Sequence, residues 1–152
     1  PSVVKIKFKP SLLNFALMIE LEKEEPIAII CSNQCFYLGN HSYIYPEKIN
    51  FAYLIIRSSL EIKPYSYLSP LLTLALTKIF EYSNLTTLPL KEVHLLSNYD
   101  LKLITAENKS ILLDPHKDID KQLKKLSYFL ANYKKSDYFQ LDLRIPNKIY
   151  FK

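Results

Sequence analysis

The sequence predicts an α+β fold, with a mainly antiparallel sheet and two helices packed on one face. Short segments rich in Tyr, Phe, Ile and Val, with apolar residues at alternate positions, indicate strands. Two longer segments, at residues 70–84 and 119–133, place apolar residues at helical spacing instead. The chain has 152 residues, 49% of them hydrophobic, and is therefore long enough to bury a core.

The chain begins with two predicted strands. Residues 4–8 alternate apolar side chains with lysines, and residues 15–21 alternate again. An acidic run at residues 22–25 is followed by Pro26, which indicates a boundary near residue 24. Because two strands alone do not make a stable domain, we treat residues 1–23 as a fragment of one unit and residues 24–152 as a second unit.

A hairpin is predicted next, with Cys31 and Cys35 on either side of a turn at residues 32–34. If the two cysteines lie opposite each other, a disulfide is possible outside the cytoplasm. Two free buried thiols are the alternative, because cysteine is also a common core residue. The sequence leaves both open.

A second turn at residues 39–42 leads into a short strand at residues 43–45. For residues 51–56 the apolar run fits either a strand or a buried helix, and periodicity does not decide between them. Ser69 and Pro70 then predict the start of the first helix, as cap and first-turn proline.

We place the end of this helix at Asn84, and a three-stranded meander at residues 92–96, 99–105 and 110–113. Asp118 is the expected cap of the second helix. Its apolar stripe comprises Ile119, Leu123, Leu126, Leu130 and Tyr133.

Residues 138–152 predict two strands around a Pro146-Asn147 turn. In the first strand, one face carries Phe139, Leu141, Leu143 and Ile145. Asp142 and Arg144 share the other face, where they can pair with each other or with neighbouring strands and fix the penultimate strand. Proline beside a strand favours the edge of a sheet. An edge strand carries unpaired backbone groups to which a partner strand can bind.

The sequence gives less support to other classes of function. The single glycine excludes glycine-rich phosphate loops. Residues 114–120, with three aspartates and His116, are the best metal or acid–base candidate, but their spacing matches no known loop. We therefore predict no enzyme, with no catalytic, cofactor or metal residues and no small-molecule substrate. The net charge of +5 comes from scattered lysines, which indicate a solvated surface rather than a nucleic-acid site.

Several stretches carry a resemblance, above all Asp142-Leu143-Arg144 followed by Ile-Pro-Asn. The others are residues 8–10, 18–21, 25–28 and 121–130. In order and spacing they resemble the strands, the proline-alanine junction, the last helix and the closing motif of the FtsQ/DivIB family of bacterial cell-division proteins.

The resemblance implies a non-enzymatic divisome scaffold. Residues 1–23 would be the last strands of a POTRA domain, giving a partial POTRA-like hairpin, and residues 24–152 the β domain. It implies FtsB/FtsL-type partners, a coupling of assembly to septal peptidoglycan synthesis, and a single-pass parent in the cytoplasmic (inner) membrane with this part outside the cytoplasm. We expect the chain to be a piece of a longer protein with an apolar segment of about 20 residues upstream.

The resemblance also implies a partner-binding edge, supported structurally by Asp142 and Arg144. The edge comprises Ile145, Asn147, Lys148, Ile149, Tyr150, Phe151 and Lys152. Ile145 stands where the family often has an aromatic residue, and Asn147 where a turn glycine is common. Two alternatives stay open: another POTRA-containing envelope assembly protein, such as an outer-membrane assembly factor, and a basic nucleic-acid-binding α+β domain.

Overall fold

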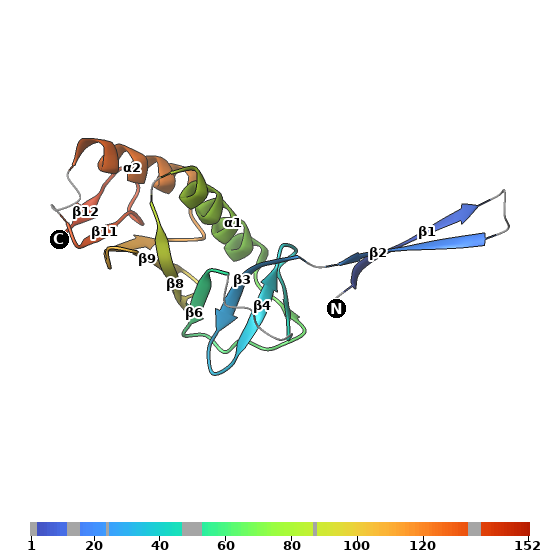
Figure 1. Ribbon diagram of the computed structural model, residues 1–152. Helices are drawn as coiled ribbons and strands as arrows, with labels where there is room; N and C mark the ends of the chain where they lie inside the picture. The colour runs from blue at the N-terminus through green and yellow to red at the C-terminus, as the bar shows by residue number, and fades with distance from the viewer. Residues whose placement is uncertain (1–2, 12–15, 24, 47–52, 87, 134–137) are drawn as a thin grey trace.

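The structure is a computed structural model of the chain. It describes residues 3–11, 16–23, 25–46, 53–86, 88–133 and 138–152. It confirms the α+β class, with a large, mainly antiparallel sheet and two helices. The first two strands, β1 (Val3–Ser11) and β2 (Ala16–Lys23), pair antiparallel in a sheet of their own and extend away from the larger body (Figure 1). The boundary near residue 24 stays a prediction.

The larger sheet has ten strands in the order β12-β11-β10-β9-β8-β6-β3-β4-β5-β7. The first five in the chain are β3 (Pro26–Cys31), β4 (Cys35–Gly39), β5 (Tyr43–Tyr45), β6 (Ile55–Ser58) and β7 (Ser66–Tyr67). The others are β8 (Leu90–Ser97), β9 (Asp100–Thr105), β10 (Ser110–Leu113), β11 (Gln140–Asp142) and β12 (Tyr150–Phe151). The edges of this sheet are therefore β7 and β12.

The predicted hairpin is formed by β3 and β4, and the predicted meander by β8, β9 and β10, both with antiparallel registers. Three neighbouring pairs within the described residues are parallel: β3 with β6, β6 with β8, and β10 with β11. Parallel neighbours need a crossover connection. The helix α1 (Pro70–Leu85) lies in the crossover from β6 to β8, and α2 (Ile119–Asn132) in that from β10 to β11. Both helices cover the same face of the sheet (Figure 1).

The two helices begin where the sequence predicts. The Ser69 hydroxyl accepts a hydrogen bond from the Leu72 N–H at 3.2 Å, and α1 ends at Leu85, one residue beyond the predicted end. The Asp118 carboxylate accepts one from the Lys121 N–H at 3.1 Å at the start of α2. The inward face of α2 also includes Phe129, which the predicted stripe lacks.

The main core lies between the helices and one face of the sheet. The strand residues buried in it include Ala28, Ile30, Leu38, Ile44, Ile56, Val93, Leu95, Leu101, Leu103, Ile111, Leu113 and Leu141. Along each strand they are spaced by two, so a single face of the sheet supplies them. The run left open as strand or helix contributes Ile56, from β6; residues 47–52 lie outside the described part of the chain.

A smaller cluster lies on the other face of the sheet, around Ile29, Tyr37 and Tyr45. Cys31 and Cys35 pack against it and are joined by a disulfide, with their Cα atoms 4.1 Å apart. They are paired directly across β3 and β4. The structure therefore shows the bonded alternative of the two that the sequence left open.

Candidate protein-interaction edge

The last strand lies at the edge of the large sheet, as the sequence predicts. β12 pairs antiparallel with β11, matching Leu141 with Phe151 and Asp142 with Tyr150. β11 in turn runs parallel to β10. Because α2 makes this crossover, the helix lies beside the hairpin formed by β11 and β12 (Figure 1).

Arg144 is held by carboxylates from two separate parts of the chain. Its Nη2 lies 2.6 Å from Asp142 Oδ2, its Nε 3.0 Å from Asp142 Oδ1, and its Nη1 2.5 Å from Asp100 Oδ1. The Asp142 contact is bidentate, the strongest geometry for such pairs. Hydrogen bonding to Arg144 holds the pKa of Asp142 below its usual value, although burial opposes this. The bonds to Asp142 and Asp100 raise the pKa of Arg144.

Asp142 and Arg144 are predicted to support the final hairpin, and their contacts tie that hairpin to β9 through Asp100. Asp100 begins β9 and was not identified from the sequence. It lies 44 positions before Arg144, and nothing in the local pattern links the two. The Ser97 hydroxyl donates a hydrogen bond to Asp100 Oδ2 at 3.2 Å, which orients this carboxylate toward its partner.

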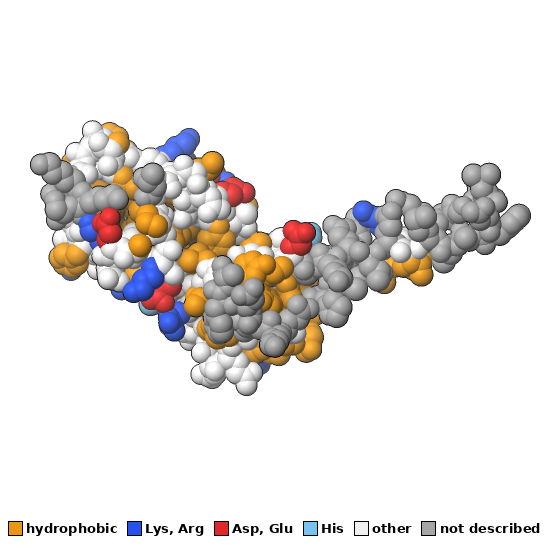
Figure 2. Space-filling model, in the orientation of Figure 1, with side chains coloured by type: hydrophobic (Ala, Val, Ile, Leu, Met, Phe, Trp, Pro, Cys, Tyr) orange, Lys and Arg blue, Asp and Glu red, His pale blue; other side chains and the backbone are white. Residues whose placement is uncertain are grey.

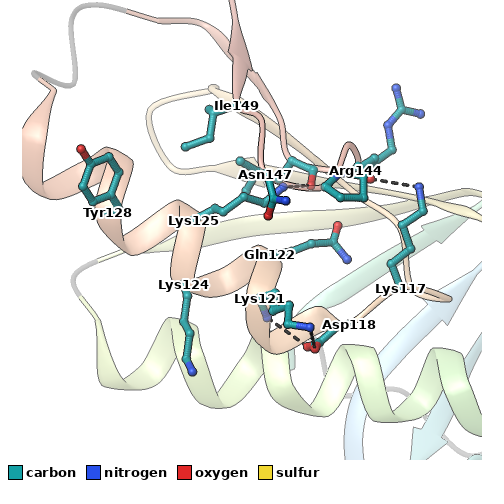
Figure 3. Close-up of a pocket in the computed structure, with 12 residues that line it drawn as sticks. Lys117, Asp118, Lys121, Gln122, Lys124, Lys125, Tyr128, Arg144, Asn147 and Ile149 are labelled. Carbon is teal, nitrogen blue, oxygen red and sulfur yellow. Dashed lines mark hydrogen bonds and ion pairs between the residues drawn. The ribbon is translucent and has the colours of Figure 1, made fainter.

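Lys125, in the middle of α2, joins the helix to the segment between β11 and β12. Its Nζ donates hydrogen bonds to the backbone carbonyl oxygens of Leu143, Ile145 and Lys148, at 2.5, 2.8 and 3.2 Å. The side chain runs from the helix toward this turn (Figure 3). Burial lowers the pKa of Lys125 and the nearby charge of Lys117 lowers it further, while the carboxylate of Asp142 opposes the shift.

The chain reverses at Ile145-Pro146-Asn147-Lys148. The Lys148 N–H donates to the Ile145 carbonyl at 3.4 Å, and Asn147 has a φ of 57°. Proline in the second position and a positive φ in the third are the signature of a type II turn. Asparagine tolerates this left-handed conformation better than most residues, and it therefore serves where the resemblance leads one to expect glycine.

Aromatic side chains hold β12 against α2. The ring of Phe151 lies 5.3 Å from that of Phe129 and 5.8 Å from that of Tyr133, measured between centroids. Ile149 is partly buried against the same core. Tyr150 lies between them in sequence and is 52% exposed. Phe151 and Ile149 therefore contact the core and the helix, although Phe151 is itself 48% exposed.

The hydrogen bonds of this hairpin show which backbone groups face outward. The Lys152 N–H donates to the Gln140 carbonyl at 3.1 Å, and the Gln140 N–H donates to the Lys152 carbonyl at 3.4 Å. In an antiparallel ladder such bonded pairs alternate with pairs whose backbone groups point away from each other. The N–H and C=O of Phe151 therefore point away from β11, toward the side where the described sheet has no further strand.

Two expectations about this region are wrong. Phe139 and Ile145 were expected to share the buried face of Leu141 and Leu143, but they are 65% and 43% exposed. The reason is that regular strand covers only Gln140–Asp142, and alternation requires continuous strand. Ile145 consequently belongs to the turn that leads into β12 and is not part of the edge strand itself.

A groove of about 610 Å³ lies between α2 and the turn. Figure 3 shows Tyr128, Lys125 and Ile149 along it, with Asn147 at its centre. Tyr128, which is 64% exposed, Ile149 and Pro146 give it an apolar wall. The described residues that line it come from α2, the segment before it and the turn that precedes β12, and none belongs to β12 itself.

Most of the cationic side chains that line the groove are engaged within the chain. Besides Lys125, Lys117 contacts Asp114 at 3.3 Å and the Arg144 carbonyl oxygen at 3.0 Å, and Lys121 contacts Asp118 at 3.2 Å. The Asp114 carboxylate also accepts a hydrogen bond from the His116 N–H. Within residues 114–120, Asp114 therefore stabilises a turn and Asp118 caps the helix. We read the lysines here as structural.

Among the described residues, no three or more His, Cys, Asp and Glu side chains are grouped so that they could hold a metal ion. Within the same residues, neither helix has the length and apolar character needed to cross a membrane. No protein-family model matches the chain, and no curated protein matches it.

Proposed function

We propose that this chain is the extracytoplasmic part of an FtsQ/DivIB-like division protein, a non-enzymatic scaffold that binds FtsB/FtsL-type partners at β12. The observation that carries the proposal is the outward backbone N–H and C=O of Phe151 at the edge of the large sheet. Backbone groups in this position can add a partner strand, whose hydrogen bonds supply affinity. The parent would be anchored in the cytoplasmic membrane, and the scaffold would couple assembly to septal peptidoglycan synthesis.

Two further features support this proposal. The motif that carries the resemblance, Asp142-Leu143-Arg144, is the part of the chain that ties the final hairpin to β9 through Asp100. The disulfide between Cys31 and Cys35 fits a location outside the reducing cytoplasm.

The nucleic-acid alternative has weaker support. The face shown in Figure 2 carries Lys and Arg side chains scattered over the surface, with acidic side chains among them. A nucleic-acid site normally gathers its positive charge in one patch or stripe. Binding to arbitrary nucleic acid that falls steeply with salt would favour that alternative. A barrel-forming region downstream in the parent would favour the outer-membrane assembly factor.

The test removes the edge. A variant lacking Lys148–Lys152 should lose capture of the FtsB/FtsL-type proteins of the same organism in a pull-down, while thermal melting still shows a cooperative transition. Some loss of melting temperature is expected, because Phe151 packs on Phe129. Tyr67→Ser is the matched control: it changes a 72% exposed tyrosine at the opposite edge strand and should leave capture unchanged. Full capture by the folded deletion variant would exclude β12 as the docking site.

A further inference from the structure

Three backbone carbonyl oxygens converge on one ammonium group at the base of the docking edge. They belong to Leu143, Ile145 and Lys148, and the group is Nζ of Lys125. We propose that Lys125 is a positioning residue that fixes the turn into β12, so that neutralising this one side chain releases the edge. The consequence for partner binding rests on the function proposed above.

The turn depends on this contact because its own hydrogen bond is weak. The single bond from the Lys148 N–H to the Ile145 carbonyl is 3.4 Å long, which is beyond the usual range for such bonds. The ammonium bridges the arm that enters the turn, at Leu143, and the arm that leaves it, at Lys148. Lys125 therefore sets where the chain emerges toward β12.

A lysine suits this position for a stereochemical reason. An ammonium has three donors and no acceptor, and here it meets three acceptors. An arginine would present its donors in a flat fork rather than a tripod. Two other lysines that line the groove have partners of their own, since Lys117 contacts Asp114 and the Arg144 carbonyl while Lys121 contacts Asp118.

Holding the edge in place should matter for binding because a partner strand then meets a preformed ladder. Without the contact, ordering the turn would be added to the cost of association.

The first experiment needs no partner. We expect Lys125→Met to speed amide hydrogen exchange at Phe139 and Lys152, whose N–H groups donate across the β11–β12 hairpin, by about tenfold or more, the factor expected when a local opening costs 1.4 kcal/mol less. Exchange at Leu103, buried in β9, should stay unchanged and so exclude global unfolding. Lys124→Met, one residue away on the same helix, is the matched control and should leave all three amides unchanged.

Equal exchange at Lys152 in the Lys125→Met and Lys124→Met variants would overturn the inference. Should Lys125→Met fail to fold, Lys125→Arg keeps the charge and the aliphatic stem. It should still speed exchange at Lys152 relative to Lys124→Met, and no difference between these two variants would count against the proposal in the same way.

The second experiment separates this inference from the proposed function. With the FtsB/FtsL-type proteins as probes, we expect Lys125→Met to slow association by about tenfold, with the smaller change in the dissociation rate. Faster exchange in a chain whose wild type binds no such protein would uphold the positioning role and reject the proposed function. Unchanged exchange together with unchanged association would reject the positioning role and leave the proposed function standing.

Discussion

At the scale of single residues, Arg144 connects the final hairpin to the rest of the sheet. Its guanidinium joins Asp142, two positions away, to Asp100 at the start of β9. Removing it would leave two carboxylates, each about one-third exposed or less, without their guanidinium partner. Loss of hydrogen bonds to charged groups at such a site costs more than loss of an exposed pair.

We therefore expect Arg144→Met to lower the free energy of unfolding by about 2 kcal/mol. Arg57→Met provides the control, because Arg57 contacts Glu92 at 2.5 Å from a side chain that is 62% exposed. That change should cost less than about 1 kcal/mol. Urea midpoints of the two variants measure the difference, and equal losses would show that Arg144 is an ordinary surface ion pair.

The same contact predicts a pH dependence. Hydrogen bonding to Arg144 lowers the folded-state pKa of Asp142. The contribution of the ionised Asp142 to stability is therefore fully present above its unfolded-state pKa, near 4. It is lost as the pH falls through the lower folded-state pKa. The gap in melting temperature between the wild type and Asp142→Asn should be constant from neutral pH to about pH 5 and narrow below about pH 4. A gap that persists at low pH would contradict this assignment.

At the scale of elements, β12 has two different sides. The Lys152 N–H bonds to the Gln140 carbonyl inside the hairpin, whereas the alternation of the ladder turns the Phe151 N–H outward. The backbone groups of Lys152 therefore anchor β12 to β11, and those of Phe151 are available to a partner strand. Backbone changes at these two residues test the two roles separately.

Replacing the Phe151 amide by an ester through protein ligation removes the outward donor and also makes the Tyr150 carbonyl a weaker acceptor. We expect it to weaken partner binding by about tenfold, as one hydrogen bond of about 1.4 kcal/mol would, with only a small loss of melting temperature. The same replacement at Lys152 removes the donor to the Gln140 carbonyl and should lower the melting temperature more. Calorimetric binding and thermal melting of the two esters measure these effects. A reversed pattern would mean that the Phe151 N–H faces β11 and the Lys152 N–H faces outward.

Elements with strong local signals were predictable from the sequence, and contacts between distant elements were not. Ser69 and Asp118 mark the helix starts because capping is a local interaction. Phe129 was missed because the predicted stripe followed one set of spacings on a helix whose inward face is broader. The partnership of Asp100 with Arg144 depends on the sheet order, which no local pattern encodes. The exposure of Ile145 follows from where the strand stops.

At the scale of the whole molecule, the sheet order is the part that the sequence could not supply. The period of a strand shows which side chains share a face but not which strand lies next to it. The insertion of β6 between β3 and β8, both parallel to it, therefore came only from the structure. With β7 at one end of the large sheet, this order leaves β12 as the other edge.

The disulfide gives a prediction about the compartment of the whole protein. If the chain lies outside the cytoplasm, Cys31 and Cys35 should resist alkylation in intact cells until a reductant is added. Replacing both by alanine should cost about 2 kcal/mol, because the bond closes only a short loop. Mass spectrometry of alkylated protein provides the measurement. Complete alkylation without reductant would place the chain in a reducing compartment and remove a main support of the envelope proposal.

The most direct test of the docking claim is the exchange rate of the Phe151 amide with and without partner. In the free chain this outward N–H should exchange rapidly. Saturation with the FtsB/FtsL-type protein of the same organism should slow it by about tenfold or more as a strand is added to the edge, while Tyr67 at the opposite edge stays unchanged. An unchanged rate at Phe151 in a complex that demonstrably forms would contradict strand addition at β12.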